Sequence, residues 1–269
     1  MDTAGKTPST LSDPVGSTQK SQLRQGFDAE RPLYYFEARL YDIWYLLIEA
    51  AKHTDASSFL QDTLVVQTLM VGQLADVIFE INTGQNLWTD LPFLGEDLEI
   101  AWHSLREVHH DGNDDGDKVR SELTSNLTSF MARLFAASNG PTSLQDSLAA
   151  CALDVFKDAF ETEQTSAQLK SILPLANLWL QSARRKLATL SSQQKQLSPG
   201  SPPGPLLETH SEDTSQTGFS ITRWKHWTRR IEELGKSEDG ELKKLADAAR
   251  YWINEWEETL PQATLITLR

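Results

Sequence analysis

Residues 218–227 have the sequence Gly218-Phe219-Ser220-Ile221-Thr222-Arg223-Trp224-Lys225-His226-Trp227, in a chain of 269 residues. From here onward apolar residues recur three or four positions apart, which is the period of one helix face. The first set is Ile221, Trp224, Trp227, Ile231 and Leu234, and the second is Leu242, Leu245, Ala249, Trp252 and Trp256. A short polar turn from Gly235 to Gly240 separates the two sets. Residues 219–269 are therefore predicted to form a helical hairpin rich in tryptophan.

Helical periodicity also dominates the rest of the chain, and alternating strand patterns are nearly absent. We expect six further helices, at about residues 32–53, 55–81, 93–110, 117–138, 142–159 and 167–190. In the second of these, Leu60, Leu64 and Val71 are predicted to point inward. The predicted fold is all-α, an antiparallel helical array of about eight helices that ends in the tryptophan-rich hairpin.

The composition divides the chain into four segments. Residues 1–30 are expected to be a disordered tail and residues 31–190 a helical domain. Residues 191–218 hold four prolines, six serines and no aromatic residue, so we expect a disordered linker in which Ser198 and Ser201 precede prolines as possible phosphorylation sites. The hairpin of residues 219–269 is expected to pack back on the helical domain, because its tryptophan stripes would be insoluble if exposed.

The hairpin sequence resembles the fungal domain-of-unknown-function family 3632. Two further stretches carry the resemblance, Leu40-Tyr41-Asp42-Ile43-Trp44-Tyr45 and Gln61-Asp62-Thr63-Leu64-Val65-Val66. It covers nearly everything after residue 30. The resemblance implies an uncharacterised fungal helical protein and attaches no chemistry to its motifs.

Charge and cysteine content exclude several classes of protein. The formal net charge is −13, which opposes attraction to phosphate backbones and anionic lipids, so neither a nucleic acid nor a membrane is the expected partner. Cys151 is the only cysteine, and its apolar neighbours predict a buried thiol. Without a signal peptide or an apolar run long enough to span a membrane, the expected location is cytoplasmic or nuclear.

The sharpest local pattern runs from Asp111 to Glu122 and matches a calcium-binding EF-hand loop. Asp111, Asn113 and Asp115 would supply oxygen ligands, and Glu122 would be the bidentate ligand at position twelve. Lys118, however, occupies a position that is normally aliphatic, and the chain has no second copy of the loop. A solvated acidic loop is the favoured interpretation, with calcium binding as the alternative.

Other clusters of polar residues have simpler explanations. His109 and His110 point about 100° apart on a helix and do not converge on one metal ion. Asp42 and Glu49 are expected to be a surface carboxylate pair. A basic rim beside Trp224 and Trp227 is assigned a structural role in preference to binding RNA or an acidic partner; it consists of Arg223, Lys225, Arg229 and Arg230. We predict no catalytic, cofactor-binding or metal-ligating residue.

The leading hypothesis is a non-enzymatic helical interaction or scaffold protein, because helical arrays offer broad surfaces and no nucleophile, metal set or phosphate loop is evident. A protein partner is possible, and the oligomeric state stays open. One alternative is an enzyme or small-ligand binder with an apolar pocket between helices, lined by Trp44, Trp102 and Trp179. Another is a calcium-responsive regulator acting through residues 111–122.

Overall fold

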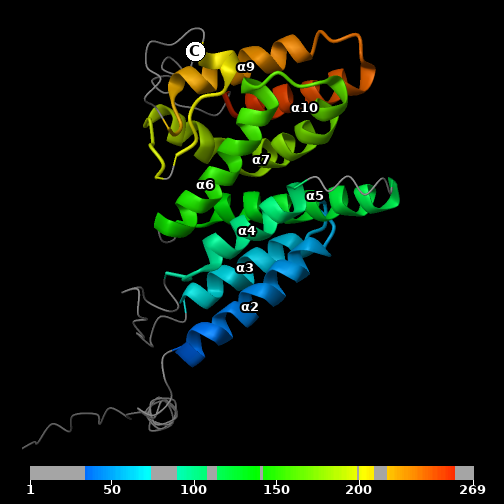
Figure 1. Ribbon diagram of the computed structural model, residues 1–269. Helices are drawn as coiled ribbons and strands as arrows, with labels where there is room; N and C mark the ends of the chain where they lie inside the picture. Colours follow the sequence, from blue (N-terminus) through cyan, green and yellow to red (C-terminus); the bar gives the residue numbers. More distant parts are fainter. Residues whose placement is uncertain are drawn as a thin grey trace, which may run out of the picture. The chain divides into compact units, whose positions relative to one another are not determined.

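The computed structural model describes residues 34–73, 90–107, 114–139, 142–198, 200–208 and 217–257 (Figure 1). The chain divides into two compact units, residues 1–40 and residues 41–269. All regular elements among the described residues are helical: nine α-helices and one short π-helix, without a strand. The prediction of an all-α fold is confirmed. The expected tail of residues 1–30 lies outside the described residues.

The helices in chain order are α2 (Tyr34–Lys52), α3 (Leu60–Gln73), α4 (Leu94–Arg106), α5 (Asp114–Ala137), α6 (Thr142–Phe156), the π-helix η1 (Lys157–Glu161), α7 (Ser166–Ser192), α8 (Pro205–Glu208), α9 (Ile221–Leu234) and α10 (Gly240–Glu257). Helix α6 continues directly into η1. Helix α7 begins at a capping box formed by Thr165 and Gln168, and Pro174 lies inside it.

The helices pack in a chain of neighbouring contacts. Helix α3 packs on α5, α5 on α7, α7 on α10, and α10 on α9, while α4 fits between α5 and α6. The largest fully buried side chains include Trp44, Trp102, Trp179, Phe130 and Phe135. Burying each such aromatic side chain contributes about 1.5–3 kcal/mol through the apolar area removed from water. The core is therefore spread along the array of helices.

The inward face of α3 differs from the sequence-based prediction. Gln61, Val65 and Thr68 are the buried residues, and Leu60 is 49% exposed. The amide of Gln61 donates hydrogen bonds to the carbonyl oxygens of Ala51, Thr54 and Asn126. These contacts join the end of α2 to α3 and α5. They hold α3 in a rotation that turns Gln61 and Val65 inward, one residue on from the predicted Leu60 and Leu64.

The C-terminal hairpin forms with most of the predicted residues inward. Trp224, Trp227, Ile231 and Leu234 of α9 are buried, as are Leu242 and Ala249 of α10. Trp252 is only partly buried. Ser220 caps α9 by accepting a hydrogen bond from the backbone N–H of Arg223. Helix α10 lies against α7, and α9 contacts η1.

Much of the expected linker is packed. Leu197 and Leu207 are buried, and α7 extends through Ser192. A Cβ atom on Gly204 would lie 2.5 Å from the carbonyl oxygen of Glu161, and one on Gly218 would lie 2.1 Å from that of Lys195. These glycines permit backbone segments to approach closely. The described residues between 191 and 218 thus differ from a free linker, while residues 209–216 lie outside the described part and the domain boundaries stay a prediction.

No helix among the described residues is both long and apolar enough to cross a bilayer.

Candidate functional site

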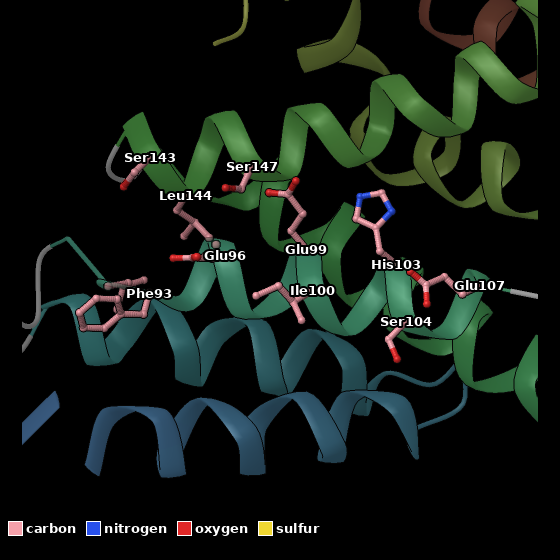
Figure 2. A pocket seen from close by; sticks show the side chains of 12 residues that line it. Phe93, Glu96, Glu99, Ile100, His103, Ser104, Glu107, Ser143, Leu144 and Ser147 are labelled. Carbon is pink, nitrogen blue, oxygen red and sulfur yellow. The ribbon is translucent and has the colours of Figure 1, made fainter. Parts of the chain in front are cut away.

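A groove with a volume of about 900 Å³ runs between α4 and α6. Figure 2 shows its α4 wall, formed by Glu96, Glu99, Ile100, His103 and Glu107. Ser143, Leu144 and Ser147 line the facing wall on α6, and Leu91 and Phe93 line one end. The groove thus combines apolar contact surface with a row of carboxylates.

The sequence of α4 divides it into two faces. Leu94, Leu98 and Trp102 lie three or four positions apart on the inner face and are fully buried. The indole N–H of Trp102 donates a 3.0 Å hydrogen bond to the Thr128 hydroxyl. Because this inner face fixes the rotation of α4, its opposite face, which carries the glutamates, is directed into the groove.

The end of the groove is built from backbone in the left-handed region. Leu91 has φ of 45° and Phe93 has φ of 67°, values that are uncommon for residues other than glycine. The Pro92 carbonyl between them accepts a 2.8 Å hydrogen bond from the Trp44 indole, and the Phe93 ring stacks on Tyr41 at a centroid distance of 4.9 Å. Such strain costs of order 1–3 kcal/mol per residue and persists only where the surrounding packing holds it.

Gly95 sets the closest approach of α4 to α6. A Cβ atom there would lie 3.1 Å from the Cβ of Ser147 and 3.2 Å from the Cα of Leu144. Any larger residue would push the two helices apart. The glycine thereby fixes the spacing between the two walls.

The charge in and around the groove is strongly negative. Glu96, Glu99 and Glu107 line it, and none of its lining residues is lysine or arginine. Nearby on α4, burial and the charge of Glu96 raise the pKa of the Asp97 carboxyl. Burial also raises the pKa of Asp154, whose carboxylate lies 3.9 Å from the Nε2 of His103. The groove is accordingly suited to a cation.

The groups that can take part in chemistry at or near the groove are His103, the serines that line its walls and Cys151. His103 makes no hydrogen bond to Ser104, Ser143 or Ser147, so these groups do not form a nucleophile and base pair as placed. Within the described segments, no three His, Cys, Asp or Glu side chains meet at metal-binding distance. Cys151 is buried, and burial raises the pKa of its thiol well above the ordinary value. The lining of the groove thus combines carboxylates, hydroxyl groups and one imidazole.

The alternative of an apolar pocket lined by three tryptophans does not fit the described residues. Trp44, Trp102 and Trp179 are at most 1% exposed and fill the core. The Trp179 ring packs edge-on against Phe135 at a centroid distance of 5.8 Å. None of the three lines the groove between α4 and α6. Their spacing identified buried helix faces correctly, but a buried face that is fully packed leaves no cavity.

The described part of the acidic stretch is helical, which bears on the alternative of a calcium loop at residues 111–122. Helix α5 begins at Asp114, so Asp115 and Glu122 are exposed residues of one helix. Seven helical residues rise about 10 Å, which places the two carboxylates too far apart along the axis to share one ion. Asp111, Asn113, His109 and His110 lie outside the described residues.

The basic rim of the hairpin is smaller than predicted because Arg223 is buried. Its Nε and Nη2 atoms pair with Oε1 and Oε2 of Glu161 at 2.8 and 2.9 Å. The Trp227 indole and the Gly204 amide donate to the same carboxylate at 2.7 and 2.8 Å. Glu161 could not be identified from the sequence, because nothing in the residues around it indicates a partner 62 positions away.

The remaining candidates are ordinary surface groups. Glu49 pairs with Lys52 at 2.7 Å and lies 3.8 Å from His53. Asp42 is exposed about two turns earlier on the same helix. The side chain of Ser198 is exposed, and that of Ser201 lies 3.4 Å from the Lys157 ammonium. Phosphorylation at either serine stays a prediction.

Comparisons with known proteins give one family and one relative. The family model described as "Protein of unknown function (DUF3632)" matches residues 44–231. The "Oxopyrrolidines biosynthesis cluster protein G" of Penicillium oxalicum is 25% identical over 257 residues, covering 83% of this chain and 67% of that protein. No solved structure matches.

Proposed function

For this chain, which belongs to the DUF3632 family with a model match over residues 44–231, we propose a role as a non-enzymatic helical interaction or scaffold protein. The groove between α4 and α6 is the proposed docking site for a protein partner. The expected setting is the cytoplasm or the nucleus.

Ile100 carries this proposal. Its side chain is 61% exposed in the middle of the groove wall, although α4 has a complete buried face on its other side. Phe93, which is partly buried, adds apolar surface at the end of the groove, whereas Leu91 and Leu144 line it as buried residues. Apolar side chains bordered by polar groups in a concave surface are typical of protein-binding sites.

A second candidate function follows from the relative's name. That protein is named as a member of an oxopyrrolidine biosynthesis cluster, so a small-molecule role in a biosynthetic pathway is the alternative for this chain. The groove volume of about 900 Å³ falls within the range of roughly 300–1,000 Å³ that is usual for ligand pockets. In that case the groove would bind a metabolite.

The experiment compares two matched surface variants. Tagged protein is purified from its native cells, co-purifying proteins are identified by mass spectrometry, and binding is then measured between purified components. Ile100→Ser should weaken binding of a genuine partner about tenfold or more, through loss of a central apolar contact. Val119→Ser is the control, because Val119 is 56% exposed on α5 and does not line the groove.

Two outcomes would contradict the proposal. One is that every reconstituted partner binds Ile100→Ser as tightly as the unmodified protein. The other is that the purified protein converts or tightly binds a metabolite and that Ile100→Ser abolishes this effect, which would favour the second candidate.

A further inference from the structure

Resting on the proposed function, we infer that the partner docks a basic amphipathic helix in the groove between α4 and α6. Its lysine or arginine side chains pair with Glu96, Glu99 and Glu107, and an apolar side chain between them covers Ile100. The charge, the spacing and the apolar exposure of the groove residues together point to this docking element.

Charge complementarity selects a cationic occupant. Three carboxylates line the groove, and its lining contains no lysine or arginine to neutralise them. A neutral or acidic partner would desolvate these carboxylates without pairing them, which disfavours its binding. The net charge of −13 also steers positively charged segments toward the protein.

The spacing of the lining residues matches a helix laid along α4. The lining residues of α4 follow one another at intervals of three or four positions, in the order Glu96, Glu99 or Ile100, His103 and Glu107. The 13 residues of α4 extend about 20 Å at 1.5 Å per residue. A partner helix of about four turns with basic residues at matching intervals would contact the whole row, which is the usual arrangement of an amphipathic helix in a groove.

The two walls of the groove differ in a way that orients the partner. The α4 wall carries the glutamates, whereas the α6 wall offers the hydroxyl groups of Ser143 and Ser147 beside Leu144. Hydroxyl groups both donate and accept hydrogen bonds and bear no charge. The basic face of the partner helix is therefore turned toward α4, and its uncharged polar face toward α6.

The test uses a synthetic amphipathic peptide of about 15 residues with lysines at intervals of three and four and leucines between them. A second peptide carries glutamate in place of every lysine. Binding to the full chain is measured by fluorescence anisotropy. The groove variant combines Glu96→Gln, Glu99→Gln and Glu107→Gln. The control variant combines Asp115→Asn, Asp117→Asn and Glu122→Gln, which removes the same charge from exposed positions on α5.

We expect the lysine peptide to bind the unmodified protein and the control variant within about twofold of each other. The groove variant should bind at least about tenfold more weakly, which corresponds to 1.4 kcal/mol. Raising the salt concentration should weaken binding, because the interacting charges are partly exposed. A Glu99→Lys variant should bind the glutamate peptide more tightly than the unmodified protein does.

Equal weakening by the groove and control variants would overturn the inference, since it would show only nonspecific attraction to an acidic protein. So would groove-dependent binding of spermine without binding of the peptide, which would indicate a small amine as the ligand. If a native partner depends on Ile100 but binds both charge variants equally, the proposed function stands and the basic helix is wrong.

Discussion

The Arg223 guanidinium shows how a single buried contact joins distant parts of the chain. It pairs through two nitrogens with Glu161, and its Nη1 atom donates at 3.0 Å to the carbonyl oxygens of Ser201 and Gly218. Every charged atom of the pair therefore has a partner. Such a pair is costly to break, because removing one member leaves a buried charge uncompensated.

Arg223→Met should lower the free energy of unfolding by about 3–5 kcal/mol, since it leaves the Glu161 carboxylate buried without its counter-ion. Urea denaturation followed by tryptophan fluorescence measures the loss. Arg229→Met is the matched control. Arg229 is exposed, lies 3.9 Å from Glu233 and donates to the Nδ1 atom of His226 at 3.1 Å, so its loss should cost only about 1 kcal/mol. Similar losses of unfolding free energy in the two variants would show that the buried pair stabilises the protein no more than the exposed pair does.

His226 makes the hairpin sensitive to acid. Its Nε2 atom lies 2.9 Å from the Phe160 carbonyl oxygen and must donate to it, so Nδ1 of the neutral ring accepts from Arg229 at 3.1 Å. Burial, assisted by the charge of Arg229, lowers the pKa of His226 below its ordinary value of 6.5. Protonation would break the contact with Arg229 and place two cations together.

The unfolded chain therefore binds a proton at His226 at a higher pH than the folded protein does. The stability contributed by the neutral ring is complete above pH 6.5 and is lost as the pH falls from 6.5 through the lower folded pKa. The difference in unfolding free energy between the unmodified protein and His226→Gln should shrink over this window. Denaturation at a series of pH values tests this, and a difference independent of pH would refute it.

At the scale of single elements, helix α3 shows which part of the fold the sequence leaves open. The period of α9 and α10 predicted their inner faces because polar residues separate the apolar stripes. Helix α3 has apolar residues on several sides, including Leu60, Leu64, Val65, Val66 and Met70, so periodicity alone leaves its rotation undetermined. Hydrogen bonds from Gln61 to residues far away in sequence decide it.

The candidate groove illustrates the same limit. The spacing of Leu94, Leu98, Trp102 and Leu105 predicts one inner face for α4, which directs the glutamates of its other face outward. Ser143 and Ser147 of α6 face these glutamates because α4 and α6 approach closely at Gly95 and because the backbone at Leu91 and Phe93 is strained. Neither feature has a local sequence signal. The pairing of α4 with α6 could not be predicted for that reason.

Gln61→Leu tests whether polar contacts set the rotation of α3. The change keeps similar volume but removes hydrogen bonds to three carbonyl groups, and it should cost about 1–3 kcal/mol of unfolding free energy. Gln67→Leu is the control because Gln67 is exposed on the same helix; its effect should stay within about 0.5 kcal/mol. A Gln61→Leu protein as stable as the control would mean that apolar packing alone orients α3.

At the scale of residues 41–269, the groove and the C-terminal hairpin are physically coupled through α6. One wall of the groove is α6, which continues into η1, and η1 carries Glu161 at its last position. The Phe156 ring at the end of α6 stacks on Trp227 of α9 at a centroid distance of 4.8 Å. The hairpin thus packs against the end of α6, the helix that forms one wall of the groove.

A chain ending at Ser192 should therefore fail to fold as a stable monomer. It would expose the face of α7 that packs on α10, where Asn177 donates to the Leu245 carbonyl oxygen and Arg184 lies over the Trp252 ring, and it would leave Glu161 without Arg223. Gel filtration should show aggregation, and the near-ultraviolet circular dichroism of the buried tryptophans should be lost. Co-expression of residues 193–269 should restore both signals together with binding of the lysine peptide. If the truncated chain instead remains monomeric and unfolds at the same urea concentration as the complete chain, the hairpin is a separate docking element and the coupling through α6 is wrong.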